Sequence, residues 1–181
     1  MRKRQIDLTG PDLPGQITTD LDLAILKDNQ ALEKLILLGT NITDIGLAHL
    51  KGLKHFQELC LSLTRISDAG LAHLKHLKAL RFLHLDYTKI SDAGLIHLKD
   101  LTELEYLVLE RTLITDAGLF HLKELKQLEY LDLDHTKITN AGLNHLKELK
   151  KLEVLHLEGT NITEGGIKEL EKALPTTEIN W

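Results

Sequence analysis

The sequence predicts an α/β solenoid, in which each repeat adds one short parallel strand and one short helix. Six threonines lie 24 residues apart, with no insertion or deletion between them: Thr40, Thr64, Thr88, Thr112, Thr136 and Thr160. Within each unit the spacing of apolar residues changes from two to three, as it does where a strand is followed by a helix. Aromatic residues make up only 4% of the 181 residues, so the core must be aliphatic. A unit of this size cannot bury its apolar face alone, and neighbouring units must therefore stack.

The first half of each unit predicts a strand. In residues 104–109, Leu107 and Leu109 alternate with Tyr106 and Val108, which is the spacing of a strand with one buried face. Side chains between the core leucines are expected to point outward. Because the repeat length is constant, equivalent outward side chains should form columns across the sheet.

The second half of each unit predicts a helix of one to three turns. Leu119, Leu122 and Leu125 recur every three residues and form an apolar stripe. Thr115 stands where an N-cap is needed, and the Asp that follows favours the positive end of the helix dipole. Gly118 lies in the first turn, where Gly costs about 1 kcal/mol relative to Ala. Its recurrence in six units predicts a close approach between each helix and the neighbouring backbone.

The repeated pattern L-x-x-L-x-L-x-x-T-x-I resembles the leucine-rich repeat family. The matching positions of one unit are Leu104, Leu107, Leu109, Thr112 and Ile114. The resemblance implies a right-handed horseshoe, with a parallel sheet on the concave face and short helices on the convex face. The 24-residue length and the T-D-A-G-L helix resemble bacterial repeats with helical convex faces, akin to ribonuclease-inhibitor-like proteins. Thr replaces the usual Asn or Cys of the family, and its hydroxyl is expected to bond backbone in the neighbouring turn.

The ends depart from the repeat, as the ends of a solenoid must. We predict one domain over residues 1–181, with an N-terminal cap (1–31), six repeats of which the last diverges (32–170) and a C-terminal cap (171–181). All three prolines fall in these ends.

Each cap is expected to add its own elements. Ile6 and Leu8 indicate a strand, residues 19–26 a capping helix and residues 173–181 a closing strand. Trp181 is expected to cover the last core layer, because a large aromatic side chain covers the most apolar area.

Composition argues against several classes of protein. With 22 Lys and Arg against 27 Asp and Glu, the net charge of −5 does not favour binding to nucleic acid. The single Cys60 excludes an internal disulfide and a metal site of the paired-Cys kind. No stretch approaches the roughly 18 apolar residues of a membrane span, and the basic start is not followed by an apolar signal region. We therefore expect a cytoplasmic protein that does not bind membranes, with export after removal of a signal left open.

The sequence predicts neither an enzyme nor a cofactor site. The motifs H-E-x-x-H, G-x-S-x-G and C-x-x-C do not occur. Five histidines recur every 24 residues on the helices and raise the alternatives of a metal stripe or a proton-linked effect on stability: His49, His73, His97, His121 and His145. Helices one repeat apart lie roughly 8–10 Å from axis to axis, too far for two ring nitrogens to share one metal without strain. A structural role is favoured, and no metal is expected.

The outward strand columns are the predicted binding site. They combine aromatic rings with a row of carboxylates that folding is not expected to require. The predicted partner-binding residues are Phe82, His84, Asp86, Tyr87, Tyr106, Glu110, Arg111, Tyr130, Asp132, Asp134, His156 and Glu158. Aromatic anchors beside charges are typical of protein interfaces, so we predict a monomeric, non-catalytic protein–protein interaction scaffold for a partner with a basic surface. The alternatives are a structural or assembly protein with no specific concave ligand, or a metal-binding protein that uses the histidine column.

Overall fold

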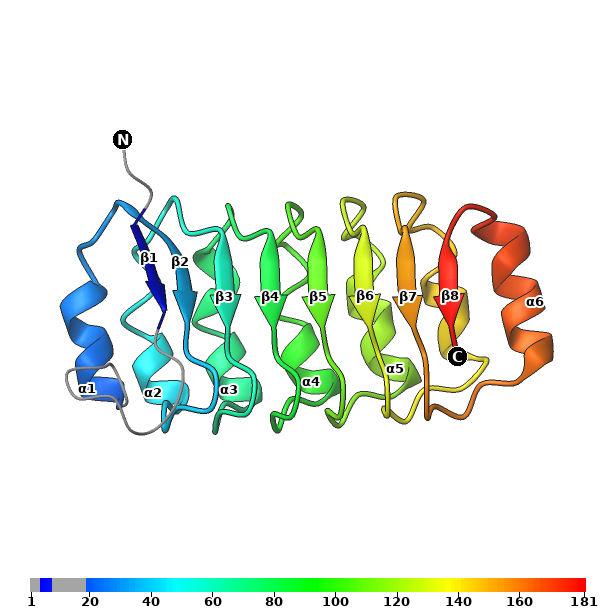
Figure 1. The fold of residues 1–181 in the computed structure, drawn as a ribbon, viewed down its shortest axis with the longest axis horizontal. Helices are drawn as coiled ribbons and strands as arrows, with labels where there is room; N and C mark the ends of the chain where they lie inside the picture. Colours follow the sequence, from blue (N-terminus) through cyan, green and yellow to red (C-terminus); the bar gives the residue numbers. More distant parts are fainter. Residues whose placement is uncertain (1–3, 8–18) are drawn as a thin grey trace.

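The computed structural model describes residues 4–7 and 19–181, with side chains from residue 19 onward. Within these residues, eight strands form one parallel sheet in chain order from β1 to β8 (Figure 1). The strands are β1 (Arg4–Asp7), β2 (Leu32–Ile36), β3 (Glu58–Cys60), β4 (Phe82–His84), β5 (Tyr106–Val108), β6 (Tyr130–Asp132), β7 (Val154–His156) and β8 (Glu178–Asn180). Every strand pairs with its neighbours along the chain, as the repeat predicts.

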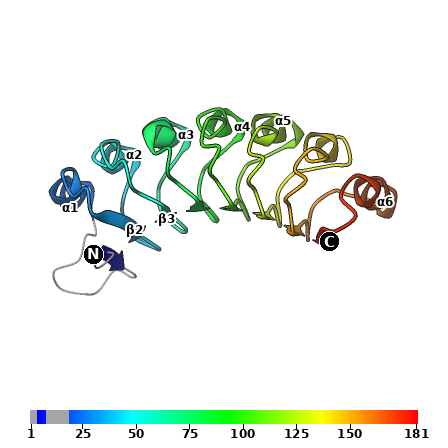
Figure 2. The same cartoon turned by 90° about the horizontal axis from the view of Figure 1, so that it is seen from above.

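Short helices form the second layer. The α-helices are α1 (Asp20–Leu23), α2 (Asp44–Leu47), α3 (Asp68–Leu71), α4 (Asp92–Leu95), α5 (Asp116–Leu119) and α6 (Glu164–Ala173). Single 3₁₀ turns add η1 (Ala24–Leu26), η2 (Leu74–His76), η3 (Phe120–Leu122) and η4 (Gly142–His145). Figure 2 shows the helices on the outer side of a curved molecule and the sheet on the inner side. The predicted horseshoe, with strands on the concave face and helices on the convex face, is confirmed.

A single aliphatic core runs between the two layers. In one unit, Leu107, Leu109, Ile114 and Leu119 are all 0% exposed, and their equivalents continue the cluster through the repeats. Burial of these side chains is the main force that holds each repeat to the next.

The aspartate at the start of each helix joins one repeat to the next. The Asp92 carboxylate accepts the Thr115 backbone N–H at 2.8 Å and the Thr115 hydroxyl at 2.6 Å. We call the equivalent set the aspartate ladder, and its pairs are Asp20–Thr43, Asp44–Ser67, Asp68–Ser91, Asp92–Thr115, Asp116–Thr139 and Asn140–Thr163. The sequence predicted the N-cap role of Thr115, whose hydroxyl accepts from Ala117, but not this bond between repeats.

The ladder explains the glycine column. A Cβ on Gly118 would overlap Oδ1 of Asp92, which belongs to the preceding repeat. The predicted close approach is therefore real, but its partner is a side-chain carboxylate and not the neighbouring backbone. The prediction for the threonine column also needs correction, because Thr112 donates to the Leu109 carbonyl at 2.7 Å within its own turn.

The N-terminal cap has the predicted elements. Strand β1 covers Ile6, whereas Leu8 lies outside the described residues. Helices α1 and η1 fill the predicted capping helix. Thr19 is the N-cap of α1, and its backbone N–H donates to Asp22 at 3.0 Å.

The C-terminal end differs from the prediction at its last residue. Helix α6 runs continuously across residue 170, and β8 is the predicted closing strand. Leu174 and Ile179 pack against the last core layer, but Trp181 is 55% exposed. Its predicted role as a lid is wrong, because Trp181 follows the last paired residue of β8 and the core is already covered there. The boundaries of the two caps stay a prediction.

Removing one rung of the aspartate ladder should destabilise the fold. The Asp92→Ala substitution leaves both Thr115 donors without their acceptor, and we expect the free energy of unfolding to fall by about 1–3 kcal/mol in urea denaturation. Asp92→Asn should retain most of the stability, because Asn140 also accepts the Thr163 backbone N–H, at 3.0 Å, and its amide N–H donates to the Thr163 hydroxyl at 2.9 Å. The exposed Asp100→Ala substitution is the control. Equal losses at Asp92 and Asp100 would contradict the ladder.

Candidate functional site

Strand pairing brings the predicted binding columns together on the concave face. Tyr106 pairs in register with Phe82 on one side and Tyr130 on the other. In the next outward column, Asp132 pairs with His156. All twelve predicted residues therefore lie on β4 to β7 or in the turns that follow these strands.

Five rings form a continuous row across these strands. Tyr106 and Tyr130 are stacked, with ring centroids 4.0 Å apart and planes at 5°. His84 lies 5.2 Å from Tyr106, and His156 lies 5.4 Å from Tyr130. With Phe82, which is 6.2 Å from Tyr106, these residues form what we call the aromatic row. The rings are half-buried because they pack on one another, whereas the sequence suggested exposed side chains.

The middle of the aromatic row carries no charge at neutral pH. Burial raises the pKa of the Tyr130 hydroxyl, and a hydrogen bond with Tyr106 raises it further. Burial also lowers the pKa of His84, against the opposing effect of the Asp86 and Glu58 carboxylates. Both shifts favour the neutral forms of Tyr130 and His84, so this part of the row presents a largely apolar surface to a partner.

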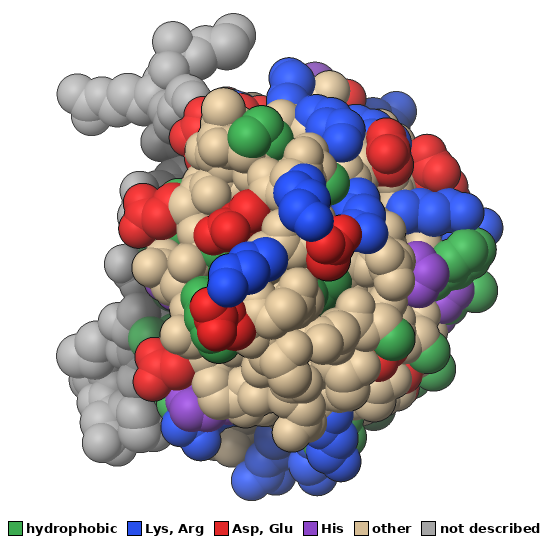
Figure 3. Space-filling model, turned by 90° about the vertical axis from the view of Figure 1, so that its right-hand side faces the viewer, with side chains coloured by type: hydrophobic (Ala, Val, Ile, Leu, Met, Phe, Trp, Pro, Cys, Tyr) green, Lys and Arg blue, Asp and Glu red, His purple; other side chains and the backbone are tan. Residues whose placement is uncertain are grey.

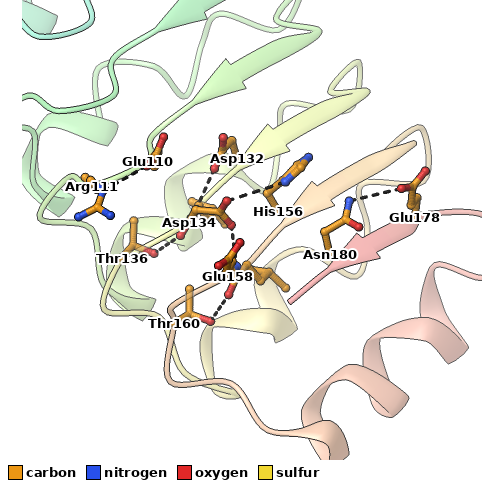
Figure 4. Close-up of polar contacts among 12 residues, drawn as sticks. Glu110, Arg111, Asp132, Asp134, Thr136, His156, Glu158, Thr160, Glu178 and Asn180 are labelled. Carbon is orange, nitrogen blue, oxygen red and sulfur yellow. Dashed lines mark hydrogen bonds and ion pairs between the residues drawn. The ribbon is translucent and has the colours of Figure 1, made fainter.

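Four carboxylates lie at one repeated position beside the aromatic row. We call Asp86, Glu110, Asp134 and Glu158 the acidic row. Asp134 accepts the backbone N–H of Glu158 at 2.6 Å and lies 3.9 Å from Nδ1 of His156 (Figure 4). Asp86 accepts the Ser62 hydroxyl. The expectation that folding does not use these carboxylates is wrong for Asp86, Glu110 and Asp134, because each bonds with a neighbouring repeat.

The acidic row gives the concave face its charge. Figure 3 views the molecule from its C-terminal end, and Asp and Glu side chains gather on the left, which is the side of the sheet. Over the part of the chain that the structure describes, no hydrogen bond or ion pair engages the Glu158 carboxylate. That carboxylate is exposed and available to a partner.

Folding disfavours the charged form of the Asp132 carboxylate. Burial raises its pKa above the usual value, and the charge of Asp134 adds to this effect. One hydrogen bond, from the Asp134 backbone N–H at 2.9 Å, opposes the shift. The charged side chain therefore lowers the stability of the folded state.

We expect Asp132→Asn to stabilise the protein at neutral pH. Because the folded pKa lies above the unfolded one, the folded state binds more protons between the two values, and wild-type stability falls as pH rises through that window. The amide oxygen of Asn can still accept from Asp134. The melting temperature of the variant should exceed that of the wild type at about pH 7, and the gain should disappear near pH 4 or below. A gain of equal size at both pH values would contradict a titration of Asp132, and the exposed Asp100→Asn substitution is the control.

The turns after β2 to β7 each contain a residue in the left-handed region. The φ angles are 58° at Leu63, 56° at Tyr87, 51° at Arg111 and 54° at His135. Non-glycine residues adopt this conformation at a cost of roughly 1–2 kcal/mol each. The sequence gives a signal that was missed, because the same repeat position is Gly39 and Gly159 in the first and last units. The predicted site includes Tyr87 and Arg111, but not Leu63 and His135.

Tyr87 and Arg111 are tied to the acidic row. The Tyr87 hydroxyl and the Arg111 Nε both donate to Oε1 of Glu110, each at 3.2 Å. The Arg111 guanidinium also lies over the Tyr87 ring, 5.5 Å from its centroid. These three side chains therefore form one cluster at the rim of the concave face.

The histidine column lies on the helix side of the molecule and does not form a metal centre. Its members are half-buried, and Phe120 lies edge-on between His121 and His145 at 5.7 Å from each ring. Figure 3 shows His and hydrophobic side chains together on that side. Among residues 19–181, no group of three or more His, Cys, Asp or Glu side chains could hold a metal ion. None of the described helices has the length and apolar character needed to cross a membrane.

Comparison with known proteins agrees with this geometry. Residues 95–162 match the family model of the leucine rich repeat. The fold is similar to that of an internalin C2 from Listeria monocytogenes, with a TM-score of 0.68 and 25% identity, over 91% of this chain and 76% of that one.

An internalin F from the same organism has a TM-score of 0.50 and 19% identity over 87% of this chain, and shows the fold alone. The chain spans 56% of the length of that internalin. No curated protein matches the sequence. The predicted likeness to ribonuclease-inhibitor-like proteins stays a prediction. Residues 95–162 are therefore similar in sequence to the leucine rich repeat, and the chain as a whole has a repeat geometry and a fold similar to those of internalin C2.

Proposed function

We propose that this chain is a non-catalytic protein–protein interaction scaffold whose concave face binds a partner with a basic surface. The leucine-rich repeat match and the internalin-like fold support a protein-binding role. The observation that carries the proposal is the position of the aromatic row beside the acidic row, on β4 to β7 and the turns that follow them. Figure 2 shows these strands on the inner side of the molecule, opposite the helices.

The two rows supply different parts of the binding energy. The stacked rings of Tyr106 and Tyr130 are rigid, so a partner that covers them orders few additional side chains. The carboxylates attract Lys and Arg side chains and raise the rate of encounter. Since neighbouring strands lie roughly 4.8 Å apart, β4 to β7 offer a contact surface about 14 Å wide.

Selection of peptides from a random display library tests this proposal. We expect the enriched sequences to combine Lys or Arg with large apolar residues, and to lose binding to the Tyr106→Ala variant. Tyr106→Phe should retain binding, because it keeps the ring. The matched control is Phe120→Ala, which removes an exposed ring from the helix side.

Two results would contradict the concave site. One is enrichment of peptides that bind Tyr106→Ala as tightly as the parent protein. The other is a loss of binding with Phe120→Ala. Circular dichroism of each variant separates a lost contact from a lost fold, since Tyr106 is half-buried.

A further inference from the structure

We propose that Leu63, Tyr87, Arg111 and His135, which we call the rim column, form a second contact that selects the partner. The inference rests on the proposed function and adds the chemistry of the partner. The bound segment presents apolar side chains to Leu63 and Tyr87, and basic side chains to the neighbouring acidic row.

The first observation is that these side chains are placed at a conformational cost. All four residues have a positive φ, and the same position is glycine in the first and last units. Glycine adopts this conformation without steric penalty, so the fold alone favours glycine at every position. The four central repeats instead carry Leu, Tyr, Arg and His.

The second observation is that burial does not offset this cost. Leu63 is 55% exposed and Tyr87 is 45% exposed. Leu113, two residues after Arg111 and at the repeat position of Arg65 and Lys89, is a further exposed apolar side chain, at 52%. Large apolar side chains that are exposed in adjacent repeats indicate a surface that a partner covers.

The backbone holds the rim column against the acidic row. The N–H of Leu63 donates to the carbonyl of Asp86 at 3.0 Å, and the N–H of Tyr87 donates to the carbonyl of Glu110 at 3.0 Å. The same bond joins Arg111 to Asp134 at 3.0 Å. The backbone of each rim residue is therefore fixed beside the acidic residue of the next repeat, and the Tyr87 side chain also reaches the Glu110 carboxylate.

Charge determines which partner fits. The Glu110 carboxylate already bonds with the Tyr87 and Arg111 side chains, whereas the Asp86 carboxylate accepts the Ser62 hydroxyl and the Asp86 carbonyl accepts the Leu63 N–H. Arg65 and Lys89, two residues beyond Leu63 and Tyr87, are exposed and repel a cation that approaches from the outer side. A segment with basic and apolar side chains therefore fits only with its basic groups directed toward the concave face.

Three synthetic peptides test the inference. The first alternates Lys and Leu over eight residues, the second replaces each Leu with Ser, and the third replaces each Lys with Glu. At low ionic strength, we expect the Lys-Leu peptide to bind the wild-type protein about tenfold more tightly than the Lys-Ser peptide, and the Glu-Leu peptide not to bind.

The Leu63→Gly/Tyr87→Gly variant should lose the preference for Lys-Leu over Lys-Ser and keep or raise its melting temperature. The matched control is Ile96→Ala/Phe120→Ala, which removes two exposed apolar side chains from the helix side and should keep the preference. Tyr106→Ala should weaken both basic peptides.

The other possible outcomes contradict either the rim contact or the proposed basic partner. A preference that persists in the Leu63→Gly/Tyr87→Gly variant overturns the rim contact and leaves the concave scaffold standing. A melting temperature lowered by several degrees also overturns it, because the side chains would then serve the fold. Self-association of the wild-type protein that the variant abolishes assigns the rim to a second copy and overturns the inference. If neither Lys-containing peptide binds the wild type, the proposed basic partner is wrong, and the rim contact that rests on it is wrong with it.

Discussion

Leu107→Ala is expected to lower the free energy of unfolding by about 2–5 kcal/mol. Leu107 is 0% exposed, lies in the middle of β5 and pairs in register with Leu83 and Leu131. The substitution removes buried apolar atoms and leaves a cavity between two repeats, which neither neighbour can fill without leaving its own register. Urea denaturation followed by circular dichroism measures the loss.

Leu113→Ala is the matched control, because it makes the same chemical change in the same repeat at an exposed position. We expect its effect to stay within about 0.5 kcal/mol. If the two variants lost the same stability, the continuous core between the layers would not be what holds the repeats together.

The repeat allowed the sequence to predict the fold in detail. A constant period of 24 residues requires every strand to pair with its neighbour at the same position. The residues that share a column with Tyr106 or with Asp132 could therefore be predicted from their 24-residue spacing. The change from period two at Leu107 and Leu109 to period three at Leu119 separated strand from helix.

The polar contacts between repeats could not be predicted in this way. An Asp after an N-cap residue is explained equally well by the helix dipole, so the pattern at Asp92 did not reveal its bonds to Thr115. The left-handed turns could not be predicted from a single repeat either, because Leu and Tyr rarely adopt a positive φ, so Leu63 and Tyr87 do not indicate one. Only alignment of these positions with Gly39 and Gly159 reveals it.

The sequence predicted which residues of the candidate site share a column, but not which of their side chains are in contact. Register places Tyr106 beside Tyr130, but stacking depends on side-chain rotamers that no spacing determines. The acidic row appeared as four equivalent carboxylates. The structure distinguishes Asp134, which accepts a backbone N–H, from Glu158, which is exposed.

Glu158 has an exposed carboxylate, and the Glu110 carboxylate bonds the side chains of Tyr87 and Arg111 rather than a backbone N–H, so these are the two charges to reverse. The Glu110→Lys/Glu158→Lys variant should slow association with a basic, concave-binding peptide by a factor of about ten or more at low salt. The difference from wild type should shrink as ionic strength rises, since salt screens exposed charges. Stopped-flow fluorescence over a salt series measures the association rates. Asp134 is left intact, because its loss would free the backbone N–H of Glu158 and confuse binding with stability.

The control for this experiment has the same net charge. Each Glu→Lys change adds two charge units, so Glu110→Lys/Glu158→Lys and Glu124→Lys/Glu148→Lys both take the protein from −5 to −1. Glu124 and Glu148 follow η3 and η4 and are exposed on the helix side. If both doubles slow association equally, total charge governs encounter and the position of the acidic row does not. A loss confined to the concave double means that the peptide approaches the strands between β5 and β7, where the aromatic row lies beside the reversed charges.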